Sequence, residues 1–119
     1  MNPPLPLVSI ICRSINRPEL HQALESVAFQ EYSPIEVVLV DALGEGISID
    51  SELRQKLNLV EVGIGTQCAR SAAANLGLDN ATGELLLFLD DDDFIASKHI
   101  SSLMKCFSEN PTTRVVYSG

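Results

Sequence analysis

The stretch GELLLFLDDDDF, residues Gly83–Phe94, places five apolar residues directly before four consecutive aspartates. A continuous apolar run of this length is typical of a strand that is buried on both faces. The carboxylates that follow must stay in water, take up protons or meet a cation, because an isolated charge is expensive to bury. The sequence therefore predicts a buried strand that ends in the densest negative charge of the chain.

Other segments show the same kind of alternation between strands and helices. Strand patterns lie at residues 7–12, 35–40 and, more weakly, 59–62, and RVVYS at 114–118 predicts a further strand. Helical patterns start at Pro18, cover 49–57 weakly, run from an N-cap at Thr66 to about residue 78, and follow a cap at Ser97. This order predicts an α/β fold, a Rossmann-like, doubly wound and mainly parallel sheet with right-handed crossovers.

The predicted sheet has one edge at which ligands would bind. Ligands of such sheets bind outside the carboxyl ends of the strands. The segments that follow Cys12, Val40 and Leu89 meet along that edge. We therefore expect residues 13–17, Asp41 and the four aspartates to share one cleft.

The four aspartates favour a divalent metal. In an extended segment alternate side chains point the same way, so Asp90 and Asp92 would share one side and Asp91 and Asp93 the other. Two carboxylates on one side suit a hard cation such as Mg²⁺ or Mn²⁺, with water and substrate phosphates as further ligands. An acidic, solvated turn is the alternative, but the position at the ligand-binding edge favours the metal.

Composition limits the class of protein. The chain has 119 residues, enough for one domain, and its net charge of −8 without a basic cluster argues against a nucleic-acid partner. Three widely spaced cysteines without a C-x-x-C pair indicate a reducing compartment, and the sequence shows neither a signal peptide nor a membrane-spanning run. We therefore expect a cytoplasmic protein.

Other acidic or nucleotide-binding sites fit less well. An EF-hand that starts at Asp90 would place Phe94 and Ile95 where an oxygen ligand and a glycine are needed. A receiver domain would carry an acidic pair after the first strand, where this chain has CRS at 12–14. The P-loop pattern is absent, and GIG at 63–65 is too short for a dinucleotide fingerprint.

Taken together, the motifs resemble the inverting nucleotide-sugar glycosyltransferases of family two, which have the GT-A fold. VSIICRSINRPEL at 8–20 is similar to the family's opening VSVIIPTYNRPEL, and IEVVLVDA at 35–42 is similar to IEVIVVDD. The most specific match is NLGLDNATGELLLFLDDDD at 75–93, which follows NxGLxxAxGExxxFLDxDD. VVYSG at 115–119 is similar to the strand that leads out of the nucleotide-binding half.

The resemblance implies nucleotide contacts from several places in the chain. Ser14, Asn16 and Arg17 lie in the loop that approaches the nucleotide, and Asp41 matches the acid that contacts the base. Arg70 matches the family's arginine near the uracil or the diphosphate, although the family often writes ARN where this chain has AAN at 73–75.

The resemblance also implies the metal ligands and some differences in base recognition. Asp92 of the D-x-D element matches the metal-bridging carboxylate, and Asp90 and Asp91 lie where ribose or metal contacts are made, so Asp92 and Asp90 are the expected ligands of Mn²⁺ or Mg²⁺. The chain departs from the family at three further positions, where Pro, Tyr and a second Asp are replaced by Arg13, Ile15 and Ala42, so that base recognition is expected to differ.

The implied function is metal-dependent transfer of a sugar, hexosyltransferase-like, from a nucleoside-diphosphate sugar to an acceptor hydroxyl. We expect residues 1–119 to be the donor-binding portion of a glycosyltransferase domain, truncated at the C-terminus and inactive alone, with the catalytic base beyond residue 119. The acceptor, sugar and base are not specified, and an exposed sheet edge favours a homodimer. A nucleotidyl-binding enzyme and a non-catalytic module of the same architecture remain open alternatives.

Overall fold

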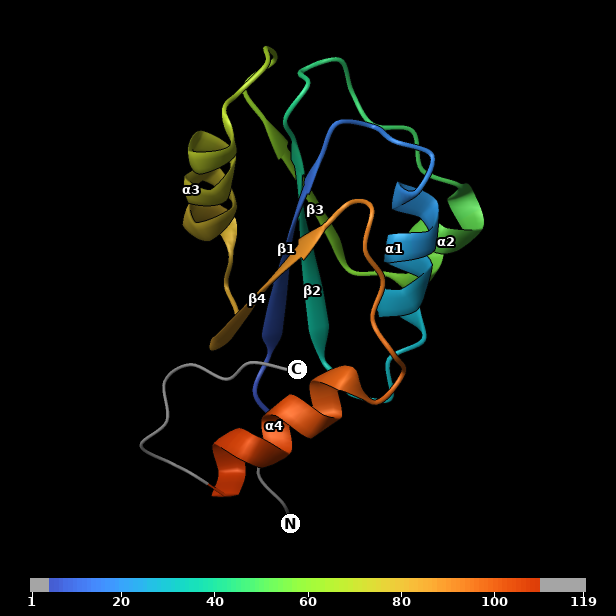
Figure 1. Ribbon diagram of the computed structural model, residues 1–119, viewed down its shortest axis with the longest axis vertical. Coiled ribbons are helices and arrows are strands. Elements are labelled where there is room, and N and C mark those ends of the chain that lie inside the picture. The colour runs from blue at the N-terminus through green and yellow to red at the C-terminus, as the bar shows by residue number, and fades with distance from the viewer. Residues whose placement is uncertain (1–4, 110–119) are drawn as a thin grey trace.

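The computed structural model describes residues 5–109, and these residues form one parallel sheet flanked by helices (Figure 1). The four strands of this part of the chain lie in the order β3-β2-β1-β4, with all three neighbouring pairs parallel. Their bounds are β1 Val8–Ser14, β2 Ile35–Asp41, β3 Leu59–Gly63 and β4 Leu85–Asp90. The predicted α/β fold with a parallel sheet is confirmed, and the predicted strand at 114–118 lies outside the described residues.

Helices cover both faces of the sheet because the residues of β1 alternate between two apolar clusters. Ile10 and Cys12 pack with α1 (Leu20–Ala28), α2 (Ser51–Lys56) and α4 (His99–Glu109), while Ile11 packs with α3 (Arg70–Asn80). Figure 1 shows α3 on one face, α1 and α2 on the other, and α4 at the end of the sheet away from the β4 turn. No helix within residues 5–109 is long and apolar enough to cross a membrane.

Two predicted helix starts are wrong. Thr66 is not an N-cap, because Ala69 is the N-cap of α3 and the backbone N–H of Cys68 donates to the carbonyl of Ala42 at 2.9 Å. This bond holds the segment beside the end of β2, so α3 begins only at Arg70. Ser97 does not cap α4 either: α4 begins at His99, whose N–H donates to the carbonyl of Ala96.

A buried carboxylate joins three segments at the amino end of the sheet. Glu36 is 5% exposed and accepts hydrogen bonds from the Ser9 hydroxyl at 2.6 Å and from the Thr82 N–H and hydroxyl at 2.9 and 2.8 Å. Burial alone would raise the pKa of Glu36, but these hydrogen bonds outweigh it and hold the pKa below its usual value. Glu36 thus ties β1, β2 and the turn before β4 together.

Gly77 lets α3 approach the sheet closely. A Cβ added there would clash with Cγ2 of Ile11 and would lie 3.3 Å from Cγ2 of Val40. Both neighbours are β-branched and buried, so they have little freedom to move aside. Gly77 therefore lets α3 pack directly on β1 and β2.

We expect Glu36→Gln to destabilise the fold by about 1–3 kcal/mol at neutral pH, because the amide presents a donor to groups that need an acceptor. The folded-state pKa of Glu36 lies below its unfolded value, so its stabilisation is complete above the usual pKa of 4.5 and is lost as pH falls through the folded value. Urea unfolding of wild type and variant at neutral and acid pH measures both effects. The difference in unfolding free energy between wild type and Glu36→Gln should shrink in acid. Glu52 is exposed, so Glu52→Gln should show neither effect.

Gly77→Val is expected to cost at least about 2 kcal/mol of unfolding free energy, because it overpacks the contact between α3 and Ile11. Ala72→Val lies on the exposed side of the same helix and carries the same β-branched side chain, so it should cost no more than about 0.5 kcal/mol. Equal midpoints for the two variants in thermal unfolding would contradict the close approach.

Candidate functional site

The four aspartates do not continue the extended strand. Asp90 is the last residue of β4, and the N–H of Asp93 donates to its carbonyl at 3.1 Å, which closes a turn. Asp91 is 3% exposed, whereas the other three aspartates are exposed. The predicted alternation is therefore wrong for this segment, because the turn sends only Asp91 inward and leaves Asp93 on the side of Asp90 and Asp92.

The carboxylate of Asp91 holds the loop that follows β1. It accepts hydrogen bonds from the Ser14 hydroxyl at 3.1 Å and the Ile15 N–H at 3.0 Å, and Nε of Arg17 lies 3.5 Å from its other oxygen. The Ser14 hydroxyl oxygen in turn accepts the N–H of Asn16, which has a left-handed φ of 61°. The ends of β1 and β4 are thus joined by a buried, charge-assisted network.

The three outward aspartates have the donor chemistry of a cation site. Carboxylate oxygens of Asp90, Asp92 and Asp93 all lie within 4.8 Å of one another. Nη1 of Arg17 lies 3.4 Å from an oxygen of Asp92. Hard oxygen ligands in a half-open cluster, with room for water and phosphate, fit Mg²⁺ or Mn²⁺. Asp93 was missed by the sequence reasoning because only the turn brings it to this side.

Asp41 shapes a second part of the same edge. Its two carboxylate oxygens accept the N–H groups of Gly44 at 2.8 Å and Gly46 at 2.7 Å, and both glycines have positive φ. The loop encloses a hollow of about 500 Å³, which Asp41 and Gly63 line. Asn16 reaches this loop from the β1 side, since its Oδ1 accepts the N–H of Ser48 at 3.4 Å.

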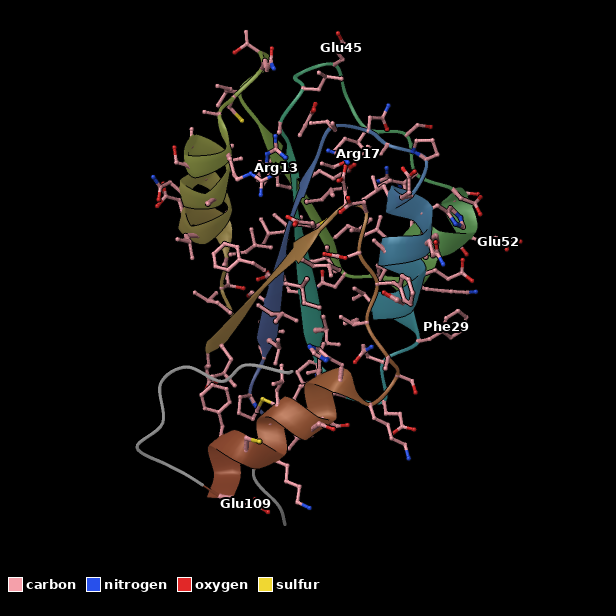
Figure 2. The ribbon with its side chains drawn as sticks, viewed as in Figure 1. Arg13, Arg17, Phe29, Glu45, Glu52 and Glu109 are labelled. Carbon is pink, nitrogen blue, oxygen red and sulfur yellow. The ribbon has the colours of Figure 1, made fainter. Side chains whose placement is uncertain are left out.

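Arg70 lies on the other face of the sheet. It is the first residue of α3 and lines a smaller cavity with Arg13 and Asp90. Figure 2 shows Arg13 between α3 and the upper ends of the strands, and Arg17 on the α1 side. The structure therefore gathers Ser14, Asn16, Arg17 and the aspartates around one turn, with Asp41 and Arg70 at neighbouring hollows on either side.

The thiol of Cys12 is buried in the apolar cluster that contains residues of α1. Burial first, and then the charges of Asp91 and Asp90, raise its pKa to about 12. Because only the thiolate attacks, a thiol that stays protonated at neutral pH contributes packing alone.

Comparison with known proteins identifies the family. Residues 9–119 match the model of Glycosyl transferase family 2. The uncharacterized glycosyltransferase YwdF of Bacillus subtilis is 31% identical over 99 residues, which are 82% of this chain and 37% of that protein. The chain spans less than half the length of this and a second curated relative, from Haemophilus influenzae.

Solved structures share the fold. S. aureus TarS 1-349 in complex with UDP superposes with a TM-score of 0.73 at 26% identity, over 93% of this chain and 38% of TarS 1-349. The mannosyltransferase PcManGT from Pyrobaculum calidifontis, in complex with GDP-Man and Mn²⁺, gives a TM-score of 0.73 at 24% identity, over 88% and 33% of the two chains. The chain therefore belongs to glycosyl transferase family 2 and has the GT-A fold.

Proposed function

We propose that the chain is the donor-binding part of a metal-dependent glycosyltransferase, which transfers a sugar from a nucleoside-diphosphate sugar to an acceptor hydroxyl. The observation that carries the proposal is the outward cluster of Asp90, Asp92 and Asp93 at the carboxyl end of β4, in a chain of this family. The UDP complex of TarS and the GDP-Man and Mn²⁺ complex of PcManGT support it, because both neighbours share the fold.

The hollow beside Asp41 suits the nucleoside. Glycines at 44, 46, 63 and 65 leave room for a planar base, and the hollow of about 500 Å³ is of the size that small-molecule sites have. Each carboxylate oxygen of Asp41 already accepts one backbone N–H and retains a second lone pair. Asp41 can therefore accept an N–H of the base without losing the contacts that hold its loop.

The turn after β4 suits the diphosphate. Asp90 and Asp92, with Asp93 as a third candidate, would hold the cation, and bound Mn²⁺ or Mg²⁺ supplies positive charge that offsets the charge of the leaving diphosphate. Asp91 and Ser14 fix the turn and the β1 loop in position. Arg17 keeps one guanidinium nitrogen near Asp92 and adds positive charge at the same place.

Several parts of the proposed function do not rest on the cluster of Asp90, Asp92 and Asp93. We assign no catalytic base among the described residues. Sugar transfer itself, the acceptor, a homodimer and a cytoplasmic location remain predictions. Arg70 and Asn16 also remain predicted donor contacts.

A non-catalytic nucleotide-binding module is a second candidate, and Ala42 favours it. Ala42 is 1% exposed and its N–H donates to the carbonyl of Ser14, so it offers no carboxylate where the family has a second Asp. A protein that binds the donor without releasing nucleoside diphosphate in the presence of acceptors would fit this candidate.

Donor binding is expected to depend on a divalent cation. We expect calorimetric titration of the full-length protein with UDP-sugars and GDP-sugars to show at least tenfold tighter binding with Mn²⁺ than with EDTA, for the nucleotide that the hollow accepts. Asp92→Asn should abolish most of this gain because it removes a cation ligand. Asp79→Asn removes one exposed carboxylate from α3 and should keep the gain.

The proposal fails if no nucleotide sugar binds in a cation-dependent way, or if Asp79→Asn and Asp92→Asn lose the cation effect equally.

A further inference from the structure

Arg13 is an unusual residue at the end of β1. Its Nε is buried and has no hydrogen-bond partner, and within residues 5–109 its guanidinium makes no ion pair with a carboxylate. Arg13 and Asp90 are paired in register on adjacent strands, yet they do not form a salt bridge. A buried donor without a partner is costly, so it calls for an acceptor that residues 5–109 do not supply.

The side chain of Arg13 lines a cavity that brings two guanidinium groups together. The cavity holds about 190 Å³, and its walls combine Arg13, Arg70 and the carboxylate of Asp90 with Ile11, Ala74, Phe88 and Leu89. Two guanidinium groups that line one cavity attract an anion, and a cation bound by Asp90 would offset the charge of that carboxylate. Each guanidinium also presents a planar set of N–H donors, which matches a carboxylate or phosphate.

The position of α3 adds to this attraction. Arg70 begins the helix, and Ala69 at the N-cap has no side-chain oxygen to accept the first N–H groups. The amino end of a helix carries partial positive charge, which favours an anion nearby.

Asp90 connects this cavity to the proposed cation site. It lines the cavity and is also one of the three outward aspartates. An anion in the cavity therefore lies beside a cation held by the cluster, as a phosphate of a nucleoside diphosphate would. This step rests on the proposed function.

We infer that Arg13, together with Arg70, forms an oxyanion pocket for a donor group beyond the α-phosphate. Two sources share that chemistry, namely the β-phosphate and an acidic group on the sugar. Arg13 is then a specificity-determining residue, since it stands where the family resemblance places a proline.

The test compares wild type with Arg13→Gln and Arg13→Lys in the full-length protein. Calorimetric titrations in the presence of Mn²⁺ use four ligands: the nucleoside monophosphate, the nucleoside diphosphate, the nucleoside-diphosphate glucose and the nucleoside-diphosphate glucuronate. The base of all four is uracil or guanine, whichever wild type binds more tightly. If the β-phosphate is the ligand, Arg13→Gln should bind the diphosphate about tenfold more weakly and the monophosphate within twofold. If the sugar carboxylate is the ligand, Arg13→Gln should bind only the nucleoside-diphosphate glucuronate about tenfold more weakly than wild type does. The affinity of Arg13→Lys should fall between those of wild type and Arg13→Gln, because lysine keeps the positive charge but lacks the planar set of N–H donors.

Thermal unfolding separates this role from a structural one. Among the described residues Nε of Arg13 has no hydrogen-bond partner, so Arg13→Gln should leave the melting temperature unchanged or raise it. Lys105→Gln on α4 removes one positive charge at the opposite end and should change no affinity.

Two outcomes would overturn the inference. One is equal affinity of Arg13→Gln and wild type for all four ligands, and the other is a lower melting temperature with unchanged binding, which would make Arg13 a counter-charge for Asp90. Failure of wild type to bind any nucleotide would overturn the proposed function and, with it, this inference.

Discussion

The buried carboxylate of Asp91 is the contact on which the rest of the site depends. It binds the Ser14 hydroxyl and the Ile15 N–H and lies beside the guanidinium of Arg17, so the turn after β4 and the loop after β1 are fixed to each other. A buried charge that lost these partners would cost about 3–5 kcal/mol. Since one aspartate of the four is turned inward, the others remain together on the outer side, where a cation can reach them.

The two ends of the sheet differ in whether the fold satisfies the hydrogen bonds of their polar groups. At the amino end, the carboxylate of Glu36 has its hydrogen bonds supplied by Ser9 and Thr82. At the carboxyl end, the aspartate cluster is exposed, and Arg13 has a buried nitrogen for which the described part of the chain offers no partner. Polar groups that the fold satisfies stabilise the fold, whereas polar groups that it leaves unsatisfied are available to a ligand. This division agrees with the general position of ligand sites in parallel sheets.

The parallel sheet and the end of the sheet that carries the site could be predicted from sequence, because apolar runs indicate strands and the carboxyl ends of parallel strands meet. The predicted burial of the run before the aspartates is wrong: among the described strands β4 lies at the end of the order, and Leu86 and Phe88 are 49% and 56% exposed. The helix starts were less predictable: Thr66 has the chemistry of an N-cap, but a backbone hydrogen bond from Cys68 to Ala42 holds its segment beside the end of β2. The grouping of Asp90, Asp92 and Asp93 could not be predicted, because four consecutive aspartates do not specify that the chain turns after Asp90. The orphan nitrogen of Arg13 depends on the placement of α3, which is a tertiary effect.

Anomalous scattering from crystals of the full-length protein grown with Mn²⁺ and a nucleoside diphosphate tests the central claim most directly. We expect a manganese peak within coordination distance of oxygens from at least two of Asp90, Asp92 and Asp93, with Asp91 still bound to Ser14 and Ile15. A manganese ion held by the Asp91 carboxylate, or a turn in which Asp91 has left the β1 loop for solvent, would contradict it.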